Sequence, residues 1–451
     1  MTAQDIRIAG AGLAGMTAAI NLALAGYRPV VYELRKDVGM RSAGDFQYFE
    51  NWTRPEDMLY FLRSINIKLD FPITPVKAAT ALDVHRRQYH FRSDRPLGYM
   101  IRRGCFEDTL DLALKRQAMR LGVRFEFGRK ATSKEVDIVA TGPDNQISYV
   151  LIHGVTFDTD LRDTIWLLFD QQVAPKVYAY LVAHGGRGVA CACFRRRARG
   201  TAHKEDYLMR AVDAFQTISK FTIKNRHRFG NYGITPLIDD FKKPIVGEAA
   251  GFQDANWGFG MHHAVESGYL AAVSIIEGRD HWRMVRQKII PWVESSWVNR
   301  YIIEKFGDRG YEWLLRILCK RQSSHVDLNR IYSPHVWKSL LARTMCHDQK
   351  RSYLIMEVRV EQGVFSFFGA KSKVAFRNRK LTLMNSADLE SKKAERYKLT
   401  SKLLIKASAL GITLKNLVYN VEEVVDLNKG LVSQVLKQRN GGYFHLRLID
   451  D

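Results

Sequence analysis

The sequence predicts an α/β protein that begins with a βαβ unit and continues into a strand-rich region. The first sign is an apolar strand at residues 6–10, followed by a glycine-rich turn, an apolar helix at 16–25 and a second strand at 29–33. The second sign is strand-like alternation through most of 147–194. The chain has 451 residues, which leaves room for about three domains.

The elements after the βαβ unit follow from hydrophobic periodicity and from turn residues. Up to residue 145 we expect a helix at 52–64, strands within 76–91, a helix at 105–121, strands at 123–127 and 136–140, and a turn at 141–145. Farther on we expect a helix at 206–219, a buried strand at 244–246, a glycine-spaced loop at 247–260 that opens a helix ending near 277, and helices through 281–345.

The last 101 residues change character, and we place a domain boundary near residue 350. Alternation predicts a hairpin at 355–362 and 372–378, and helical periodicity predicts helices at 392–410 and 421–436. This part is basic. Aromatic residues interleaved with positive charge would suit a nucleic acid, but packing or oligomerisation is the commoner explanation, so we expect no nucleic-acid partner.

Composition narrows the class of protein. A chain that is 46% hydrophobic and 26% charged is neither disordered nor collagen-like. A formal charge of +22 favours anionic, phosphate-bearing partners. The five cysteines lack the paired spacing of a zinc site or a secreted disulfide framework, so we expect no metal and a reducing compartment. No apolar run reaches the ~18 residues of a membrane span. We therefore expect a cytoplasmic protein that can sit peripherally on the inner face of a membrane.

The first motif occupies the turn between the first strand and the first helix. Gly10, Gly12 and Gly15 permit a tight turn, close approach of a pyrophosphate to the backbone and close packing of helix on strand, and Leu13 and Ala14 open the helix. The positive end of the helix dipole and its free N–H groups attract an anion there. The competing interpretation is a glycine-rich turn that serves packing only.

The acid that completes this motif stands at the end of the second strand. Glu33 follows Gly10 by 23 residues, where its carboxylate can accept hydrogen bonds from an adenosine ribose and would repel a 2′-phosphate. Leu34, the next residue, is a further candidate contact. The fingerprint suits NAD and FAD equally, so other segments must decide between them.

A second glycine motif supplies that distinction. Residues 247–252 follow a short strand, Gly258, Gly260 and Met261 lead into a helix, and that helix contains Glu266-Ser267-Gly268. Together these segments resemble the geranylgeranyl reductase family of FAD-dependent oxidoreductases, which is related to the aromatic hydroxylases. Residues 98–107, 140–144 and 175–180 resemble further segments of the same family, and the resemblance covers about residues 4 to 345.

The resemblance implies a glutathione-reductase-type FAD-binding Rossmann domain with an antiparallel-sheet substrate domain, a helical segment and an extra small C-terminal domain. The implied boundaries are 1–50, 85–145 and 240–280 for the FAD-binding domain, 51–84 and 146–239 for the substrate-cavity domain, 281–349 for the helical segment, and 350–451 for the basic α+β domain, whose role is unknown.

The resemblance also implies FAD contacts. By position, Arg103 would contact the FAD phosphates or ribitol, and the backbone from Gly258 to Met261 would face the pyrimidine edge of the flavin. Glu248 stands where the family has an aspartate that binds the ribitol, and a carboxylate is retained with one more methylene. Arg41 and Gly142 are further candidates by position. Residues 41–45 offer no cysteine where family members often have one, so no thiol role is carried over.

The implied activity is reduction of carbon–carbon double bonds in an isoprenoid by hydride transfer from N5 of reduced flavin. Tyr178 and Tyr180 alternate on the strand that borders the substrate cavity, where one phenol could donate the accompanying proton, or both could be half-buried strand aromatics. Leu181 and Val182 replace the Phe-Pro of the family, so the shape of the substrate is open. His262 and His263 are left out of the catalytic set.

Other functions remain compatible with the sequence. One is a flavin-dependent monooxygenase or halogenase, although the tryptophan motif of the halogenases is absent. Another is a flavoprotein that acts as a binding or maturation factor through its C-terminal domain. The expected partners are an apolar substrate, with or without a phosphate group, and an electron donor, either NAD(P)H or an acidic ferredoxin attracted to the basic surface. Residues 195–199 form a basic run that would suit an anion or a solvated loop.

Overall fold

The computed structural model describes residues 4–145, 147–196, 204–238, 243–319 and 324–342, together with five strands between residues 353 and 450. The chain divides into two compact units, residues 1–342 and 343–451, and each is described by itself. The predicted α/β class with a Rossmann sheet, an antiparallel-sheet region and a helical segment is confirmed.

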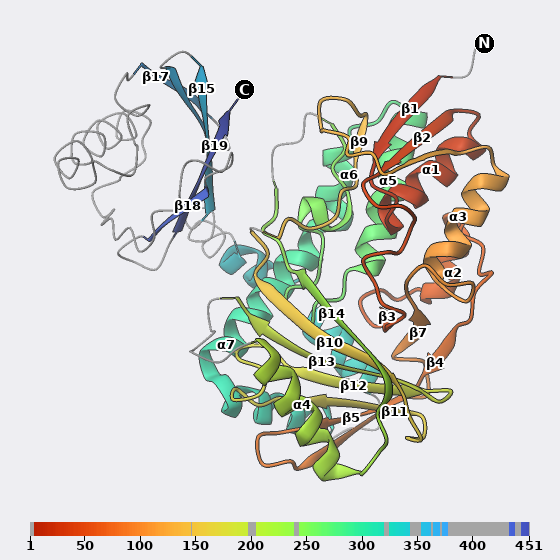
Figure 1. Ribbon diagram of the computed structural model, residues 1–451. Helices are drawn as coiled ribbons and strands as arrows, with labels where there is room; N and C mark the ends of the chain where they lie inside the picture. Colours follow the sequence, from red (N-terminus) through yellow and green to blue (C-terminus); the bar gives the residue numbers. More distant parts are fainter. Residues whose placement is uncertain are drawn as a thin grey trace. The chain divides into compact units, whose positions relative to one another are not determined.

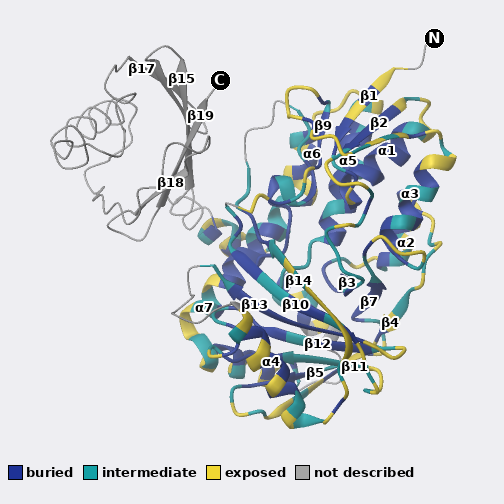
Figure 2. Ribbon diagram, viewed as in Figure 1, coloured by how far each residue is buried: buried dark blue, intermediate teal, exposed yellow. Residues whose placement is uncertain are grey.

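A four-stranded parallel sheet forms the first layer of the larger unit (Figure 1). Its order is β8-β2-β1-β9, with β1 at Asp5–Ala9, β2 at Arg28–Glu33, β8 at Arg124–Phe127 and β9 at Ile138–Val139. The helix between β1 and β2 is α1, Leu13–Leu24, and all residues from Leu13 to Leu22 are buried. Its apolar circumference is explained by its position, because α5, Met261–Ile276, packs along it (Figure 2).

A small antiparallel sheet follows, and it contributes residues to the site described below. Its order is β3-β7-β4, with β3 at Phe46–Glu50, β7 at Gly98–Arg102 and β4 at Thr74–Val76. Helix α3, Leu110–Arg120, returns the chain from β7 to the parallel sheet and packs on α1. Thr109 caps α3 by accepting a hydrogen bond from the backbone N–H of Leu112.

A seven-stranded sheet forms the other half of the larger unit, in the order β14-β10-β13-β12-β11-β5-β6. Its strands are β5 at Ala78–Leu82, β6 at Gln88–Arg92, β10 at Val150–Asp158, β11 at Thr164–Leu168, β12 at Ala179–His184, β13 at Arg187–Arg195 and β14 at Lys224–Gly233. Alternate residues supply two cores: one face packs on α4, Lys204–Ile218, and the other contributes to the core around the site.

Three helices complete this unit: α6, His281–Lys288, α7, Ile290–Leu318, and α8, Ser324–Tyr332. Helix α7 is kinked at Gly307, which has a φ of 58°. Side chains of α7 and α8 reach back to the loop between the 3-10 turn η1, Gly247–Ala250, and α5. Among the described residues, none of the helices combines the length and the apolar character needed to cross a bilayer.

The C-terminal unit contains a five-stranded sheet in the order β17-β16-β15-β19-β18. The strands are β15 at Tyr353–Glu361, β16 at Val364–Gly369, β17 at Ser372–Arg377, β18 at Ser433–Lys437 and β19 at Tyr443–Asp450. An extra strand, β16, therefore lies between the two predicted strands. The predicted helix at 421–436 is wrong at its end, where β18 pairs with β19, and the predicted helix at 392–410 lies outside the described residues.

Four further points differ from the expectations. The helix expected at 52–64 begins only at Met58 as α2, Met58–Ser64, because the Asp57 carboxylate accepts the N–H of Leu59 and so caps the helix there. This helix belongs to the core around α1 and not to the substrate-cavity part, where 51–84 was placed. Conversely, β6 lies in the predicted 85–145 part of the FAD-binding domain, yet it pairs with β5 in the seven-stranded sheet. Strand β14 was not predicted, because its exposed polar residues hide the alternation.

Candidate cofactor and substrate site

The first glycine turn joins β1 to α1 in the geometry that the motif requires. Gly10 has a φ of 105°, and a Cβ there would lie 2.2 Å from the carbonyl oxygen of Ala140. A Cβ at Gly15 would lie 2.0 Å from the oxygen of Gly10. A Cβ at Gly12 would meet none of the described atoms within 4 Å, and none of the described side chains caps α1. The helix therefore presents N–H groups beside an open position, which suits a phosphate.

Glu33 closes this turn from the end of β2. Its Oε2 accepts the N–H of Ala11 at 2.9 Å, and its Oε1 accepts the N–H of Arg35 at 2.9 Å. Both oxygens keep lone-pair capacity for the hydroxyl groups of a ribose. The neighbouring Leu34 is 62% exposed, so this candidate contact can offer only backbone atoms and a surface side chain.

The second glycine motif is held directly against the first turn. A Cβ at Gly268 would lie 2.2 Å from the carbonyl oxygen of Ala14, so only glycine allows α5 to approach α1 this closely. Ser267 accepts the N–H of Gly247 at 2.9 Å, and a Cβ at Gly247 would lie 3.2 Å from that of Ala14. The two glycine motifs, more than 230 residues apart in the sequence, therefore form one surface.

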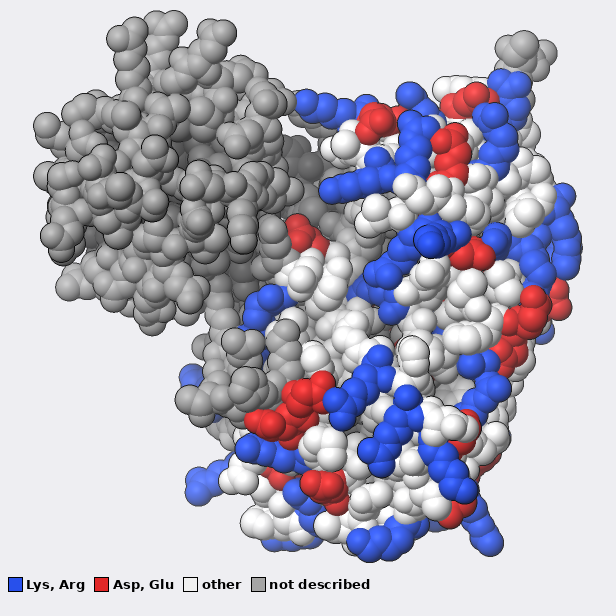
Figure 3. All heavy atoms as spheres, viewed as in Figure 1, with Lys and Arg blue, Asp and Glu red and all other residues white. Residues whose placement is uncertain are grey.

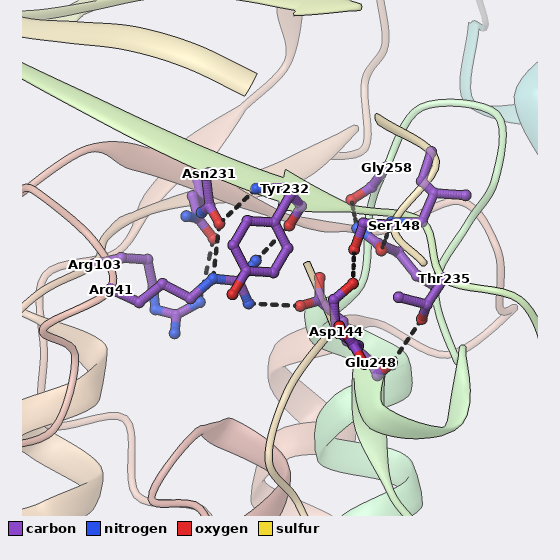
Figure 4. A network of polar contacts seen from close by, with 12 residues as sticks. Arg41, Arg103, Asp144, Ser148, Asn231, Tyr232, Thr235, Glu248 and Gly258 are labelled. Carbon is purple, nitrogen blue, oxygen red and sulfur yellow. Dashed lines mark hydrogen bonds and ion pairs between the residues drawn. The ribbon is translucent and has the colours of Figure 1, made fainter. Parts of the chain in front are cut away.

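Arg41 and Glu248 meet across this surface in an ion pair of 2.8 Å (Figure 4). The Nε of Arg41 donates to Oδ1 of Asn231 at 2.7 Å, and its Nη2 donates to the carbonyl oxygen of Tyr232 at 2.5 Å. Gly142 borders the pair, since a Cβ there would lie 3.7 Å from Nη1 of Arg41. The loop before β3 is thus tied to the end of β14.

Arg103, at the end of β7, is already engaged with protein groups. It donates from Nε and Nη2 to Asp111 at 2.7 and 2.8 Å, and from Nη1 to Gln47 at 3.2 Å. Burial lowers the pKa of Arg103, but the carboxylates of Asp111, Asp45 and Glu248 together raise it above the ordinary value. Its expected contact with the FAD phosphates or ribitol stays a prediction.

The loop before α5 carries the remaining candidates. Gly258 has a φ of 82°, and a Cβ at Gly260 would lie 3.5 Å from Oε1 of Glu248. Gln253 fixes the loop, because its side chain accepts the N–H of Ile234 at 2.6 Å and donates to the carbonyl oxygen of Gly258 at 2.8 Å. Met261 is buried at the start of α5, and none of the described side chains caps this helix.

The same loop rests on the seven-stranded sheet and on α7. Tyr178 donates to the carbonyl oxygen of Trp257 at 2.5 Å. Arg300, buried on α7, donates to Ala255 at 3.4 Å, to Asn256 at 3.3 Å and to the carbonyl oxygen of Lys176 at 2.6 Å. One guanidinium therefore joins the loop to the segment that leads into β12.

Two titratable groups under the loop are shifted by burial. Burial raises the pKa of Asp254 to about 7, although the N–H groups of Trp257 and Asn256 oppose this shift. Burial also raises the pKa of Tyr180 well above its ordinary value, and its phenol is hydrogen-bonded to Cys191. Tyr178 and Tyr180 contribute to one core together with Cys191 and Cys193. The phenols stay protonated at neutral pH.

Most of the cofactor candidates come together, and several partners were missed. The turn residues 10–15, Glu248 and the loop from Gly258 to Met261 are joined by the packing of α5 on α1, and Arg41 and Gly142 border Glu248. The missed partners are Gln47, Asp111, Asn231, Tyr232, Gln253 and Arg300. Asp111 alone had a local signal, as an acid within the helix predicted at 105–121, and it lies in the first turn of α3. Of the basic run 195–199, residues 197–199 lie outside the described residues.

Comparison with known proteins agrees with this geometry. The model of the NAD(P)-binding Rossmann-like domain matches residues 8–50. No curated protein matches the sequence. A geranylgeranyl bacteriochlorophyll reductase-like protein from Thermoplasma acidophilum is similar in structure, with a TM-score of 0.56 and 17% identity over 75% of this chain and 95% of that one. A flavoprotein/dehydrogenase from Cytophaga hutchinsonii gives a TM-score of 0.54 and 14% identity over 77% and 99%. A flavin-dependent brominase gives 0.52 and 14% over 78% and 100%. The larger unit therefore has the fold of the FAD-dependent oxidoreductases.

Proposed function

We propose that this protein is an FAD-dependent oxidoreductase. The observation that carries the proposal is the meeting of the two glycine motifs at Ala14, where Gly247 and Gly268 bring the start of α5 beside the start of α1. Two helix N-termini without a described side-chain cap then face one surface, which suits a ligand with a phosphate at one end and an electron-accepting ring at the other. The names of the similar structures support a flavin.

The residues present fit this cofactor part by part. Glu33 would accept from the adenosine ribose, and the open position at Gly12 would admit the pyrophosphate to the N–H groups of α1. Glu248 and Arg41 would border the ribitol, and the backbone from Gly258 to Met261 would donate to the pyrimidine edge of the ring. Donors at that edge stabilise negative charge on a reduced ring, because their dipoles are already oriented.

For the reaction, we propose reduction of carbon–carbon double bonds in an isoprenoid lipid. When bound, reduced FAD supplies a hydride at N5. The protein contributes an apolar wall, since Tyr178, Tyr180 and Val182 on one face of the sheet pack into the same core as the glycine loop. Burial of a polyprenyl chain against such a wall contributes about 0.8 kcal/mol per methylene. The resemblance of the motifs to the geranylgeranyl reductases supports this choice.

The binding partners that we propose follow from the positive charge of the protein surface. Lys and Arg side chains are spread over the face shown in Figure 3, and the chain carries a formal charge of +22. Such a surface attracts a phosphate-bearing lipid, an anionic membrane surface or an acidic electron donor such as a ferredoxin. NAD(P)H is the alternative electron donor.

A single-turnover experiment tests the proposed reaction. The purified protein is photoreduced without oxygen and mixed with geranylgeranyl diphosphate, and flavin absorbance and product mass are followed. We expect reoxidation of the flavin and a product heavier by two hydrogens for each bond reduced. A flavin that stays reduced with every polyprenyl chain length offered would refute the isoprenoid reductase. If oxygen instead drives hydroxylation of an added aromatic compound, the protein is a monooxygenase.

A further inference from the structure

One face of β3 is turned toward β12, the strand next to Tyr178. Residues alternate along a strand, so Phe46, Tyr48 and Glu50 share a face. The rings of Phe46 and His184, at the end of β12, lie 6.0 Å apart. Phe46 and Tyr48 pack into the same core as Tyr178. The face of β3 that carries Tyr48 therefore packs into the same apolar core as Tyr178, which is the wall proposed above for the substrate.

Tyr48 differs from the two tyrosines predicted from the sequence. Its hydroxyl oxygen is buried and has no hydrogen-bond partner in the described part of the chain. Tyr178 is committed to the carbonyl oxygen of Trp257, and Tyr180 to Cys191. Burial raises the pKa of Tyr48, which keeps its phenol protonated. A buried hydroxyl without a partner is costly, and such groups concentrate where a substrate or an ordered water completes the bonding.

A series of polar side chains, Glu50, His262, Glu266 and Arg54, leads from Tyr48 toward solvent, and it is called the proton line below. Glu50 is the next residue after Tyr48 on the same face of β3. Its Oε1 lies 3.3 Å from Nδ1 of His262, and Thr53 donates to the same oxygen at 3.2 Å. The side chains of Glu50 and His262 are only 3% and 4% exposed.

The line continues along α5. Nε2 of His262 lies 4.0 Å from Oε2 of Glu266, and Arg54 donates to that oxygen at 2.8 Å. The side chain of Arg54 is 24% exposed, so the line ends at the surface. Oε2 of Glu50 and Nε2 of His262 are buried without a hydrogen-bond partner among the described residues, which leaves both able to accept or pass a proton.

We propose that Tyr48 donates the proton that accompanies hydride transfer, and that Glu50, His262 and Glu266 return a proton to it from solvent. This inference rests on the proposed function. When bound, reduced flavin would supply a hydride, with its two electrons, to one carbon of the double bond and would itself be oxidised. Tyr48 would give its proton to the other carbon, so that two C–H bonds replace the π bond. Tyr48 regains a proton through Glu50 and His262.

The test compares single and multiple turnovers of the flavin-loaded protein with geranylgeranyl diphosphate as the probe. Tyr48→Phe should slow single-turnover reoxidation by about 100-fold or more, the usual contribution of a general acid. His262→Gln should leave the first turnover fast and slow the later ones, because it blocks only the return of the proton. Tyr89→Phe, which removes a phenol on β6 of the seven-stranded sheet that donates to Asp83, is the matched control and should react as the unmodified protein does.

A second readout needs no substrate. The negative charge on a reduced ring should shift the vibration of a nearby buried phenol that has no hydrogen-bond partner, so infrared difference spectra of flavin photoreduction should contain a tyrosine band that Tyr48→Phe removes and Tyr89→Phe retains. Reoxidation of Tyr48→Phe at the unmodified rate, or an infrared spectrum unchanged by Tyr48→Phe, would overturn the proton line. If the unmodified protein shows the band but never reacts with the probe, the proton line stands and the isoprenoid reductase is refuted.

Discussion

The closest approach between α1 and α5 gives the sharpest test of the architecture of the site. In Gly268→Ala, the added Cβ would lie 2.2 Å from the carbonyl oxygen of Ala14, a backbone atom that cannot rotate away. The helices would have to separate by about 1 Å, and overpacking of this kind costs ~1–3 kcal/mol. The gain in helix propensity from Gly to Ala, about 1 kcal/mol, opposes this cost and does not cancel its upper range.

The separation would also move the phosphate turn, because Ala14 opens α1. We therefore expect Gly268→Ala to lower the free energy of unfolding and to weaken FAD binding at least tenfold. The assays are thermal unfolding and titration of the cofactor-stripped protein by flavin fluorescence. Gly230→Ala is the control, since its Cβ would meet nothing closer than 3.8 Å. Unchanged stability and FAD affinity in Gly268→Ala would refute the reasoning.

Three further predictions concern the groups around the loop. Glu248→Ala should weaken FAD binding by roughly tenfold, because a charge-assisted hydrogen bond is lost, whereas Glu248→Asp should bind FAD nearly as well as the unmodified protein. Equal FAD affinity of both variants and the unmodified protein in fluorescence titrations would exclude Glu248 as a contact. Arg300 also pairs with Glu304 on the same helix, with its Nε 2.6 Å from Oε1. Arg300→Met should lower the free energy of unfolding by about 3 kcal/mol, the lower end for a broken buried pair, because Arg195 still pairs with Glu304; a smaller loss than in Arg279→Met, on the surface, would show that Arg300 does not hold the loop in place. Burial raises the pKa of Asp254 to about 7 in the folded state. The stability that neutral Asp254 contributes is therefore complete below about pH 4 and is lost as pH rises through 7. In urea unfolding, the free energy of unfolding of Asp254→Asn minus that of the unmodified protein should increase from pH 5 to pH 8. A difference that stays constant over this range would show that Asp254 does not titrate there.

The local sequence was enough to predict the helices and strands whose hydrophobic residues recur at a regular spacing. The βαβ unit, the strands of 147–194 and the helices between residues 261 and 332 all carry strong hydrophobic periodicity, and their existence is confirmed. Strand β14 was missed because an exposed edge strand need not alternate, and its side chains from Lys224 to Arg228 are exposed. The start of α2 was placed too early because a cap at Asp57 decides it and not the apolar pattern around it.

The glycines of the site and side chains such as Glu33, Arg41 and Glu248 were predicted, but most of the groups that they contact were not. A glycine in the sequence indicates that another part of the backbone packs closely against it, as at Gly10 and Gly268. Which segment packs there is known only from the folded structure. Two partners of Arg41 come from β14, 190 and 191 residues later, and the three carbonyl partners of Arg300 come from segments more than 40 residues earlier. No local pattern specifies such pairings. Tyr48 was overlooked for the same reason, because its importance lies in an unsatisfied hydroxyl that only the packed structure exposes.

The most direct test of the central claim is a comparison of FAD and FMN binding to the cofactor-stripped protein by calorimetric titration. FAD should bind with one molecule per chain, and FMN should bind far more weakly, because it leaves the Glu33 carboxylate and the second half of the phosphate turn without a ligand. Equal affinity for the two flavins, or no uptake of FAD, would contradict the claim that one adenine-containing flavin spans both glycine motifs.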